Sequence, residues 1–211
     1  MYLPQQFNSK NNSDAIELMR ENPFASLISV DEGGFPFVSH IPLHLEVRGS
    51  ELVLWGHVAK PNTHWRYLAE RPQALVAFLG PHAYLSPRVY PDLTRVPTWN
   101  YLAVHCKVSA RLIEDSVDKD ALLKKLIGEH EPVYAEQWRG LGEEYKLKML
   151  GGIVGFELRV TELQCKLKLN QHRPEATEST KALYNHGGEK ERALVRWMDR
   201  LGMTQTHADE A

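Results

Sequence analysis

The sequence lacks the features of a secreted, membrane-spanning or disulfide-bonded protein. Only two of its 211 residues are cysteines, and Cys106 and Cys165 lie too far apart for a C-x-x-C motif. No apolar run is long enough to span a bilayer. The first seven residues also lack the basic start and apolar core of a signal peptide. We therefore expect a soluble cytoplasmic protein, not bound to a membrane, with reduced thiols.

The sequence also lacks an excess of positive charge. It has 25 Lys and Arg residues against 27 Asp and Glu residues, for a net charge of -2. A domain that holds DNA through its overall field is normally basic. No helix-turn-helix pattern is present, and acidic residues offset the basic ones in residues 189–201. Any DNA contact would therefore need a local patch or a partner.

The common catalytic and nucleotide-binding motifs are missing as well. There is no G-x-G-x-x-G, no G-x-x-x-x-G-K-[ST] and no G-x-S-x-G. Residues 151–155 are glycine-rich, but they lie between a predicted helix and a predicted strand, so we interpret them as a turn. The ten histidines show no zinc spacing, and we expect no metal site. A haem- or metal-binding protein with a spare histidine ligand remains a less favoured alternative.

The patterns that are present predict an antiparallel α+β fold. Residues 24–30, 35–47 and 51–55 are strand-like and are joined by short turns, which predicts a meander with a break at Pro42. The prolines of residues 80–91 argue against a helix or a central strand there. An antiparallel barrel or sandwich fits this order better than a Rossmann sheet. Further strands are predicted at 74–79, 102–112, 153–160 and 164–169, and helices at 14–22, 116–129, 143–150, 175–184 and 189–201, before a frayed tail.

Residues 56–65 form the most informative stretch of the chain. They read as a strand end, a polar turn that carries His57, Lys60 and Asn62, and the start of a helix that stops before Pro72. Backbone N–H groups at a helix start attract anions, and Lys60 adds a positive charge. This arrangement predicts a phosphate site.

Polar and aromatic residues elsewhere extend this hypothesis to a flat heteroaromatic ligand with a phosphate tail. Such a ligand needs apolar walls, a few directed hydrogen bonds and a cationic cradle. Each residue alone is more often structural: Asn62 is typical of a helix cap and Lys168 of a solvated strand. The candidates are Ser39, His40, Lys60, Asn62, Thr98, Asn100, Lys168, Gln171 and Arg173, with Trp65, Tyr84, Trp99 and Tyr101 as aromatics.

An ordered set of short motifs resembles the PaiB-type family, which is described as FMN-binding negative transcriptional regulators. Each motif alone is weak, whereas the set in this order is specific, and it covers residues 1 to about 173. The motifs include ENPFA at 21–25, SHIPL at 39–43, GHVAKPN at 56–62, GPHAY at 80–84, VPTWNY at 96–101, IVGFE at 153–157 and KLKLNQHR at 166–173.

The resemblance implies an antiparallel split β-barrel with peripheral helices, of the pyridoxamine-phosphate-oxidase-like, FMN-binding type. It implies a homodimer with FMN at the subunit interface. It also implies an FMN-binding domain at residues 1–173 and a C-terminal helical extension at 174–211, packed on the same domain. His57, Lys60 and Asn62 would then hold the phosphate, and Ser39, His40 and Ile41 would follow the isoalloxazine edge. Thr98, Trp99, Asn100, Tyr101, Lys168 and Gln171 would surround the ring or the ribityl chain, some of them from the other subunit.

Two functions remain open from the sequence. The first is a flavin-binding transcriptional regulator, for which DNA binding rests on the resemblance alone. The second is an FMN-dependent oxidoreductase, such as a flavin reductase or a pyridoxamine-phosphate-oxidase-like enzyme, without direct DNA binding. No residue stands out as an acid or a base, so the catalytic residues are unknown. The sequence does not name a substrate or an operator.

Overall fold

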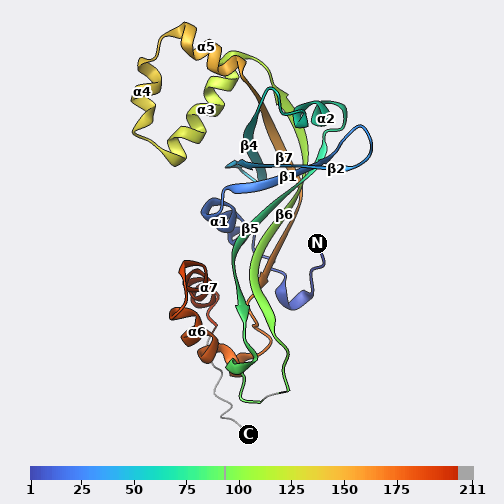
Figure 1. Ribbon diagram of the computed structural model, residues 1–211, viewed down its shortest axis with the longest axis vertical. Coiled ribbons are helices and arrows are strands. Elements are labelled where there is room, and N and C mark those ends of the chain that lie inside the picture. The colour runs from blue at the N-terminus through green and yellow to red at the C-terminus, as the bar shows by residue number, and fades with distance from the viewer. Residues whose placement is uncertain (93, 204–211) are drawn as a thin grey trace. The chain divides into compact units, whose positions relative to one another are not determined.

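The computed structural model describes residues 1–92 and 94–203 and contains one seven-stranded sheet. The strand order is β2-β1-β5-β6-β7-β4-β3, and Figure 1 labels these strands apart from β3. The strands are β1 (Phe24–Val30), β2 (Pro36–Pro42), β3 (His44–Arg48), β4 (Glu51–Ala59), β5 (Gln73–Leu85), β6 (Thr98–Ile113) and β7 (Ile153–Lys168). The helices are α1 (Asn12–Glu21), α2 (His64–Glu70), α3 (Ser116–His130), α4 (Tyr134–Gly140), α5 (Glu143–Gly151), α6 (Thr177–Asn185) and α7 (Glu189–Arg200), besides three 3-10 turns.

The chain divides into two compact units. Unit 1 comprises Met1–Leu18, Leu79–Val104 and the described residues from Gln164 onward, and unit 2 comprises Met19–Phe78 and His105–Leu163. Strands β5, β6 and β7 therefore contribute residues to both units. The domain division predicted from the sequence, at residue 173, stays a prediction, and the frayed tail predicted after Leu201 lies largely outside the described residues.

Unit 2 contains the predicted meander. β1 pairs with β2 from Phe24↔Pro42 to Val30↔Pro36, and β3 pairs with β4, both antiparallel. The chain breaks between β2 and β3 after Pro42, as the sequence predicts, because proline cannot donate to the next ladder. β4 continues the sheet by pairing with β7 from Val53↔Arg159 to Ala59↔Ile153.

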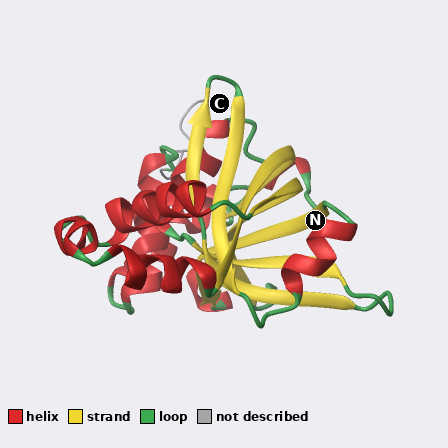
Figure 2. Ribbon diagram, turned by 90° about the horizontal axis from the view of Figure 1, so that it is seen from above, coloured by secondary structure: helices red, strands yellow, loops and turns green. Residues whose placement is uncertain are grey.

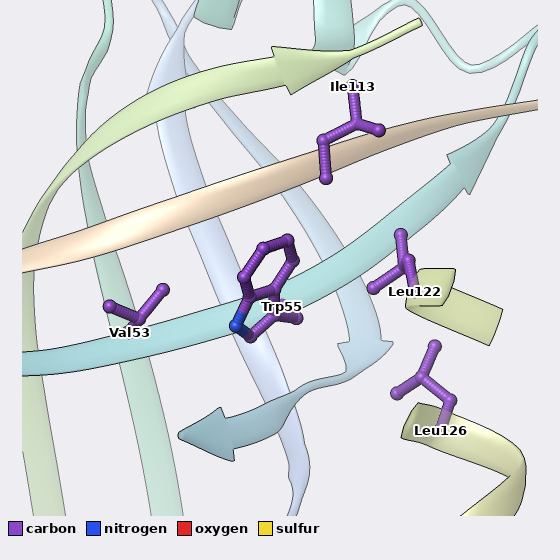
Figure 3. Packing of buried hydrophobic residues seen from close by; sticks show 5 residues of the cluster. All are labelled: Val53, Trp55, Ile113, Leu122 and Leu126. Atoms are coloured by element: carbon purple, nitrogen blue, oxygen red, sulfur yellow. The ribbon is translucent and has the colours of Figure 1, made fainter. Parts of the chain in front are cut away.

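A hydrophobic cluster joins the sheet of unit 2 to helix α3. Val53 and Trp55 of β4 and Ile113 of β6 pack with Leu122 and Leu126 of the helix (Figure 3). Trp55 is 9% exposed, and Lys125 and Arg48 lie over its ring at 4.6 Å and 5.1 Å from the centroid. This contact fixes the strand that leads to the predicted phosphate turn.

Unit 1 places a helical hairpin and the N-terminal segment on the remaining lengths of β5, β6 and β7. Helices α6 and α7 pack against each other (Figure 1), and α7 buries Leu194 and Trp197. Tyr184 of α6 is 1% exposed, and its hydroxyl donates to the carbonyl of Tyr84 at 3.3 Å. At the other end of the chain, Asn8 forms an isolated antiparallel bridge with Lys166.

Three predictions about individual strands were wrong. β4 does not end at Trp55 but runs to Ala59, because β7 pairs with it throughout. The strand predicted at 74–79 does not end there, because β5 continues through Pro81 to Leu85. The proline is tolerated at this point because β1 pairs with β5 only over Leu75–Ala77. The two predicted strands at 153–160 and 164–169 form the single strand β7.

The fold is α+β and antiparallel, as the sequence predicts; Figure 2 distinguishes its helices from its strands. Helix α4 is an additional element that the sequence analysis missed. The search for membrane-spanning helices, restricted to the described residues, finds none with the length and hydropathy required to cross a bilayer.

Candidate functional site

In unit 2, a network of three side chains joins strand β2 to the start of helix α2. The amide of Asn62 donates to Ser39 Oγ at 3.0 Å, and the same oxygen lies 2.9 Å from His64 Nδ1. Asn62 Oδ1 accepts the backbone N–H of His64 at 3.0 Å. Two of the predicted site residues, Ser39 and Asn62, are therefore brought together and held.

His64 forms the buried end of this network. The residue is fully buried, and burial lowers the pKa of its imidazole from 6.5 to about 4. Because Ser39 Oγ accepts from Asn62, its own proton can be donated to Nδ1 of the neutral ring. His64 Nε2 has no hydrogen-bond partner among the described residues, and the ring of Phe37 lies edge-on at 5.1 Å. The neutral imidazole thus fixes Ser39 without adding a charge.

The two residues after Ser39 point to opposite faces of β2. His40 is exposed; its Nδ1 lies 3.0 Å from Ser26 Oγ on β1, and its ring stacks on Phe24. Ile41 is buried, at 8% exposure. This is the alternation expected of a strand. Of these two residues, His40 therefore presents its side chain on the outer face.

His57 and Lys60 lie on β4 and on the turn that follows it. His57 was predicted on the turn, but it pairs with Gly155 inside the strand. Its Nδ1 is buried without a partner among the described residues, and burial lowers the pKa of the ring. Lys60 is exposed, and no hydrogen bond or ion pair of its ammonium is found in the described part of the chain.

The turn after Lys60 leads into helix α2, as the sequence predicts, and the side chain of Asn62 accepts the first N–H of that helix. The backbone N–H of Lys60 donates to the carbonyl of Gly152, and its own carbonyl accepts Trp65 Nε1 at 3.0 Å. Helix α2 begins four residues later, at His64, and has seven residues. The positive charge at this turn is therefore the side chain of Lys60 rather than a helix terminus.

In unit 1, Lys168 and Thr98 are brought together. Lys168 Nζ donates to Thr98 Oγ1 at 2.7 Å and lies 5.9 Å from the centre of the Tyr101 ring. Lys166 lies 5.1 Å from the same ring. Burial and the nearby Lys166 lower the pKa of Lys168, whereas Tyr101 raises it. These residues form a cationic, aromatic-walled surface.

The other predicted residues of unit 1 have different surroundings. Trp99 is 52% exposed and lies against Tyr84 in a T-shaped contact. Asn100 is fully buried, and neither Nδ2 nor Oδ1 of its amide has a hydrogen-bond partner among the described residues. Gln171 Nε2 donates to the carbonyl of Leu167, and its Oε1 accepts the N–H of Leu169 at 2.9 Å. Gln171 thus stabilises the turn that it belongs to, whereas the amide of Asn100 is buried without a partner in the described residues.

The sequence analysis missed a cavity of about 410 Å³ in unit 1, of which Thr98 and Lys168 are part. Tyr90, Arg95 and Asn170 also line it, and none of them was singled out for a ligand. A signal for Asn170 was present, because Asn after a strand and before a polar turn is typical of left-handed backbone, and its φ is 68°. Among residues 1–92 and 94–203, no group of three His, Cys, Asp or Glu residues could hold a metal ion.

The solved structures that resemble the chain define its class as a split-barrel fold found in flavin-binding proteins. The flavocytochrome Anf3 from Azotobacter vinelandii superposes with a TM-score of 0.62 at 17% identity, over 77% of this chain and 69% of that chain. The FAD and heme binding protein from Mycobacterium smegmatis gives a TM-score of 0.56 at 20% identity, over 76% of this chain and 73% of that chain. These likenesses show the fold.

The sequence comparisons show the family. Residues 1–162 match the family described as "Putative FMN-binding domain". The chain is 33% identical over 180 residues to the Bacillus subtilis protein named "Protease synthase and sporulation protein PAI 2". The aligned region covers 83% of this chain and 84% of the relative. The chain therefore belongs to this PaiB-type family of FMN-binding domains, as the sequence motifs predict, and the split barrel and FMN as cofactor are confirmed with it.

The residues of the chain fit this cofactor. Among the described residues, neither the ammonium of Lys60 nor the buried His57 Nδ1 has a partner, so both are available to a phosphate. Ser39 and Asn62 are held in place by His64. The assignment of individual residues to parts of the cofactor stays a prediction.

Proposed function

We propose that the phosphate of FMN is held at the turn after β4 and that its ring follows β2. Lys60 would supply the charge-assisted contact, with His57 and Asn62 as hydrogen-bonding neighbours. Ser39, His40 and Ile41 would line the ring edge, mainly through their backbone. Two observations carry this proposal: the ammonium of Lys60 has no partner in the described part of the chain, and Ser39, Asn62 and His64 form a hydrogen-bonded network close to it in sequence.

The proposed assembly is a homodimer in which a second subunit completes the flavin site. Thr98–Tyr101, Lys168 and Gln171 would form the remaining wall, some of them from the partner. Large apolar side chains on the surface support an interface: Phe24 is 65% exposed and Phe35 is 74% exposed. Trp99, at 52% exposure, offers a further aromatic surface in unit 1.

The biological role that we propose is negative transcriptional regulation that depends on the flavin. The support is membership of the PaiB-type family, and the described helices add no reader of DNA. On α7, Arg192 and Arg196 pair with Glu189. Arg200 pairs with Glu17 and lies 3.8 Å from Asp14. Because α7 buries Leu194, Val195, Trp197 and Met198, we favour a packing role for it, and any DNA contact would then use another surface or a partner.

A second candidate is an FMN-dependent oxidoreductase. Bound FMN would supply the redox chemistry, and the protein would hold it and exclude side reactions. The cavity of about 410 Å³ next to Thr98 and Lys168 favours this candidate, because its size is that of a small-molecule site. No described residue has the geometry that would identify it as the acid or the base.

One experiment separates the two candidates. The FMN-loaded protein is assayed for reduction of its flavin by NADH and NADPH, and for binding to DNA from its own promoter region at a fixed, stated salt concentration. Specific DNA binding that changes with the redox state of the flavin would support the regulator. Multiple-turnover oxidation of NAD(P)H with no specific DNA binding would support the oxidoreductase and contradict the regulator.

A further inference from the structure

Helices α3, α4 and α5 of unit 2 form another cavity, which shares no lining residue with the proposed flavin site. Its volume is about 260 Å³, and every residue that lines it belongs to one of these three helices. Helix α3 packs against both α4 and α5, and Figure 1 shows the three helices as consecutive elements between β6 and β7. Cavities between helices are a common place for small ligands. The lining therefore indicates what the cavity would bind.

The apolar part of the lining is only partly covered by the protein. Trp138 and Leu150 are buried, at 6% and 4% exposure. Val117 and Leu147 are open to water, at 72% and 55% exposure. Large apolar side chains that stay open beside a cavity mark a surface that an organic molecule would cover. This part of the lining thus fits a ring or a short hydrocarbon chain.

The two acidic residues of the lining are already paired with lining lysines. Lys124 Nζ lies 2.6 Å from Asp120 Oδ2, and Lys146 Nζ lies 3.0 Å from Glu143 Oε1. Asp120 accepts Trp138 Nε1 at 2.7 Å through its other oxygen. Burial raises the pKa of Asp120, but these hydrogen bonds and the charge of Lys124 hold it below its usual value. Both carboxylates are therefore engaged within the lining itself.

Arg139 is the lining cation that these pairs leave over. Three basic residues against two acidic ones give the lining one surplus positive charge. Within residues 1–92 and 94–203, no ion pair or side-chain hydrogen bond of the Arg139 guanidinium is found, and the residue is exposed. A ligand can therefore reach its N–H groups without breaking an existing contact. A guanidinium binds a carboxylate through two parallel hydrogen bonds.

Two contacts between side chains and carbonyl groups hold the helices around the cavity. Lys146 Nζ of α5 donates to the carbonyl of Arg139 at 3.2 Å and ties the end of α4 to α5. Lys119 Nζ of α3 donates to the carbonyl of Leu150 at 3.2 Å and ties α3 to α5. The backbone of Arg139 is thus held, whereas its guanidinium stays available. A site that is formed before its ligand enters loses less entropy on binding.

We propose that this cavity binds a small organic monocarboxylate with an apolar body. Arg139 recognises the carboxylate, and Val117, Trp138 and Leu147 contact the body. One negative charge matches the surplus positive charge of the lining. The volume lies just below the range of about 300–1,000 Å³ that is typical of drug-sized ligands, so the ligand has the size of a single substituted ring. The inference goes beyond the proposed function and does not rest on it.

The test uses phenylacetate as the probe. Phenylacetamide keeps its shape without the charge, and acetate keeps the charge without the ring. Binding of each compound to the FMN-loaded protein is measured by isothermal titration calorimetry. We expect phenylacetate to bind about tenfold more tightly than phenylacetamide, because only the acid forms a charge-assisted contact, and acetate to bind more weakly than phenylacetate. Equal affinities for the acid and the amide, or no binding of phenylacetate at millimolar concentrations, would overturn the proposal.

Arg139→Gln should weaken phenylacetate binding by about tenfold and leave phenylacetamide unchanged, so that the preference for the acid is lost. A merely structural role of Arg139 would weaken both compounds alike. The control is Arg159→Gln, which removes an exposed arginine of unit 2 that does not line the cavity. It should keep the preference. Loss of the preference in both variants would reduce the effect to overall charge and overturn the proposal.

Leu147→Ala tests the apolar contact. It should weaken the binding of both phenylacetate and phenylacetamide severalfold, because less apolar surface is covered. Tyr145→Ala removes a side chain of similar exposure, 52%, from the same helix but outside the lining, and both affinities should stay unchanged. Equal losses in the two variants would overturn the assignment of the apolar wall. Circular dichroism spectra that match the wild type verify that each variant is folded.

The titration with phenylacetate is repeated on the apoprotein, with flavin occupancy read from absorption. We expect the same affinity with and without FMN, because no residue of the proposed flavin site lines the cavity. A failure of FMN binding is thereby distinguished from a failure of this site. Displacement of phenylacetate by FMN would place the probe in the flavin site and overturn the proposal.

Discussion

At the scale of single residues, His64 is the side chain that organises the proposed flavin site. It is fully buried, and through Ser39 Oγ it is linked to Asn62. A charged ring in this place would have no partner on Nε2 and would lose its acceptor role toward Ser39. The network is therefore built for neutral imidazole, and its integrity depends on pH.

We predict that His64 makes the protein less stable as the pH falls from 7 to 5. The pKa of its imidazole is about 4 in the folded protein and 6.5 in an unfolded chain. As the pH falls, the unfolded chain therefore takes up the proton at a higher pH than the folded protein does. Its contribution to stability is complete above pH 6.5 and falls by about 2 kcal/mol by pH 5. Urea unfolding at pH 7 and pH 5 measures the difference. In His64→Asn, the loss of stability between pH 7 and pH 5 should shrink by about that amount. The control variant His186→Asn, at an exposed histidine, should keep the full loss. An equal loss in the wild type and both variants would contradict the role of His64.

We predict that Lys60→Ala weakens FMN binding by about 1.5–3 kcal/mol, because it removes a charge-assisted contact with the phosphate. Riboflavin, which lacks the phosphate, should bind both proteins alike. Fluorescence titration of the apoproteins measures both affinities. Lys148→Ala, at another exposed lysine of unit 2, is the matched control. An equal loss for riboflavin, or an unchanged FMN affinity, would place the phosphate elsewhere.

At the scale of elements, β4 carries the proposed phosphate turn and depends on close packing at Gly56. A Cβ on this glycine would lie 2.5 Å from Leu43 Cδ2 and 3.0 Å from the ring of Phe156. Leu43 and Phe156 are both buried, so a shift of either side chain would disturb the packing around it. The strand can therefore reach Ala59 in register with β7 only because residue 56 lacks a side chain.

We predict that Gly56→Ala destabilises the fold by about 1–3 kcal/mol, since the added methyl group overpacks the core. Gly128 on α3 is the matched control: a Cβ there meets nothing within 4 Å. Gly128→Ala should be neutral or more stable by up to about 1 kcal/mol, because alanine favours a helix. Thermal or urea unfolding compares the two. A larger loss in Gly128→Ala than in Gly56→Ala would refute the packing argument.

The elements also show what the sequence could and could not predict. The meander, α3, α5 and the α6–α7 hairpin follow from alternation, helical periodicity and turn residues, which are local signals. The course of β5 through Pro81 is not local, because it depends on where β1 stops pairing. The position of His57 inside β4 likewise depends on β7, nearly one hundred residues later.

At the scale of the whole molecule, the site predicted from the sequence falls into two groups. Ser39 to Asn62 lie in unit 2, and Thr98 to Gln171 lie in unit 1. The resemblance supplied both groups, but spacing alone could not reveal that Asn62 bonds to Ser39 or that Gln171 stabilises its own turn. The cavity was also beyond prediction, because Phe7, Arg95 and Asn170 come from three distant segments.

We predict that the protein is a dimer in solution, with about twice the chain mass of 24.1 kDa. The exposed Phe24 and Phe35 would then be covered by the partner. Multi-angle light scattering measures the mass, and Phe35→Asp should shift it toward the monomer. Phe35→Leu, which keeps the apolar surface, is the control. A monomeric wild type at all concentrations would contradict the shared flavin site.

The measurement that tests the central claim most directly is the visible absorption spectrum of the purified protein, before and after added FMN and after denaturation. We predict a flavin spectrum, with the flavin released on denaturation and identified as FMN. Protein isolated without flavin should acquire that spectrum with one FMN per chain. A colourless protein that remains flavin-free after incubation with excess FMN would contradict the account.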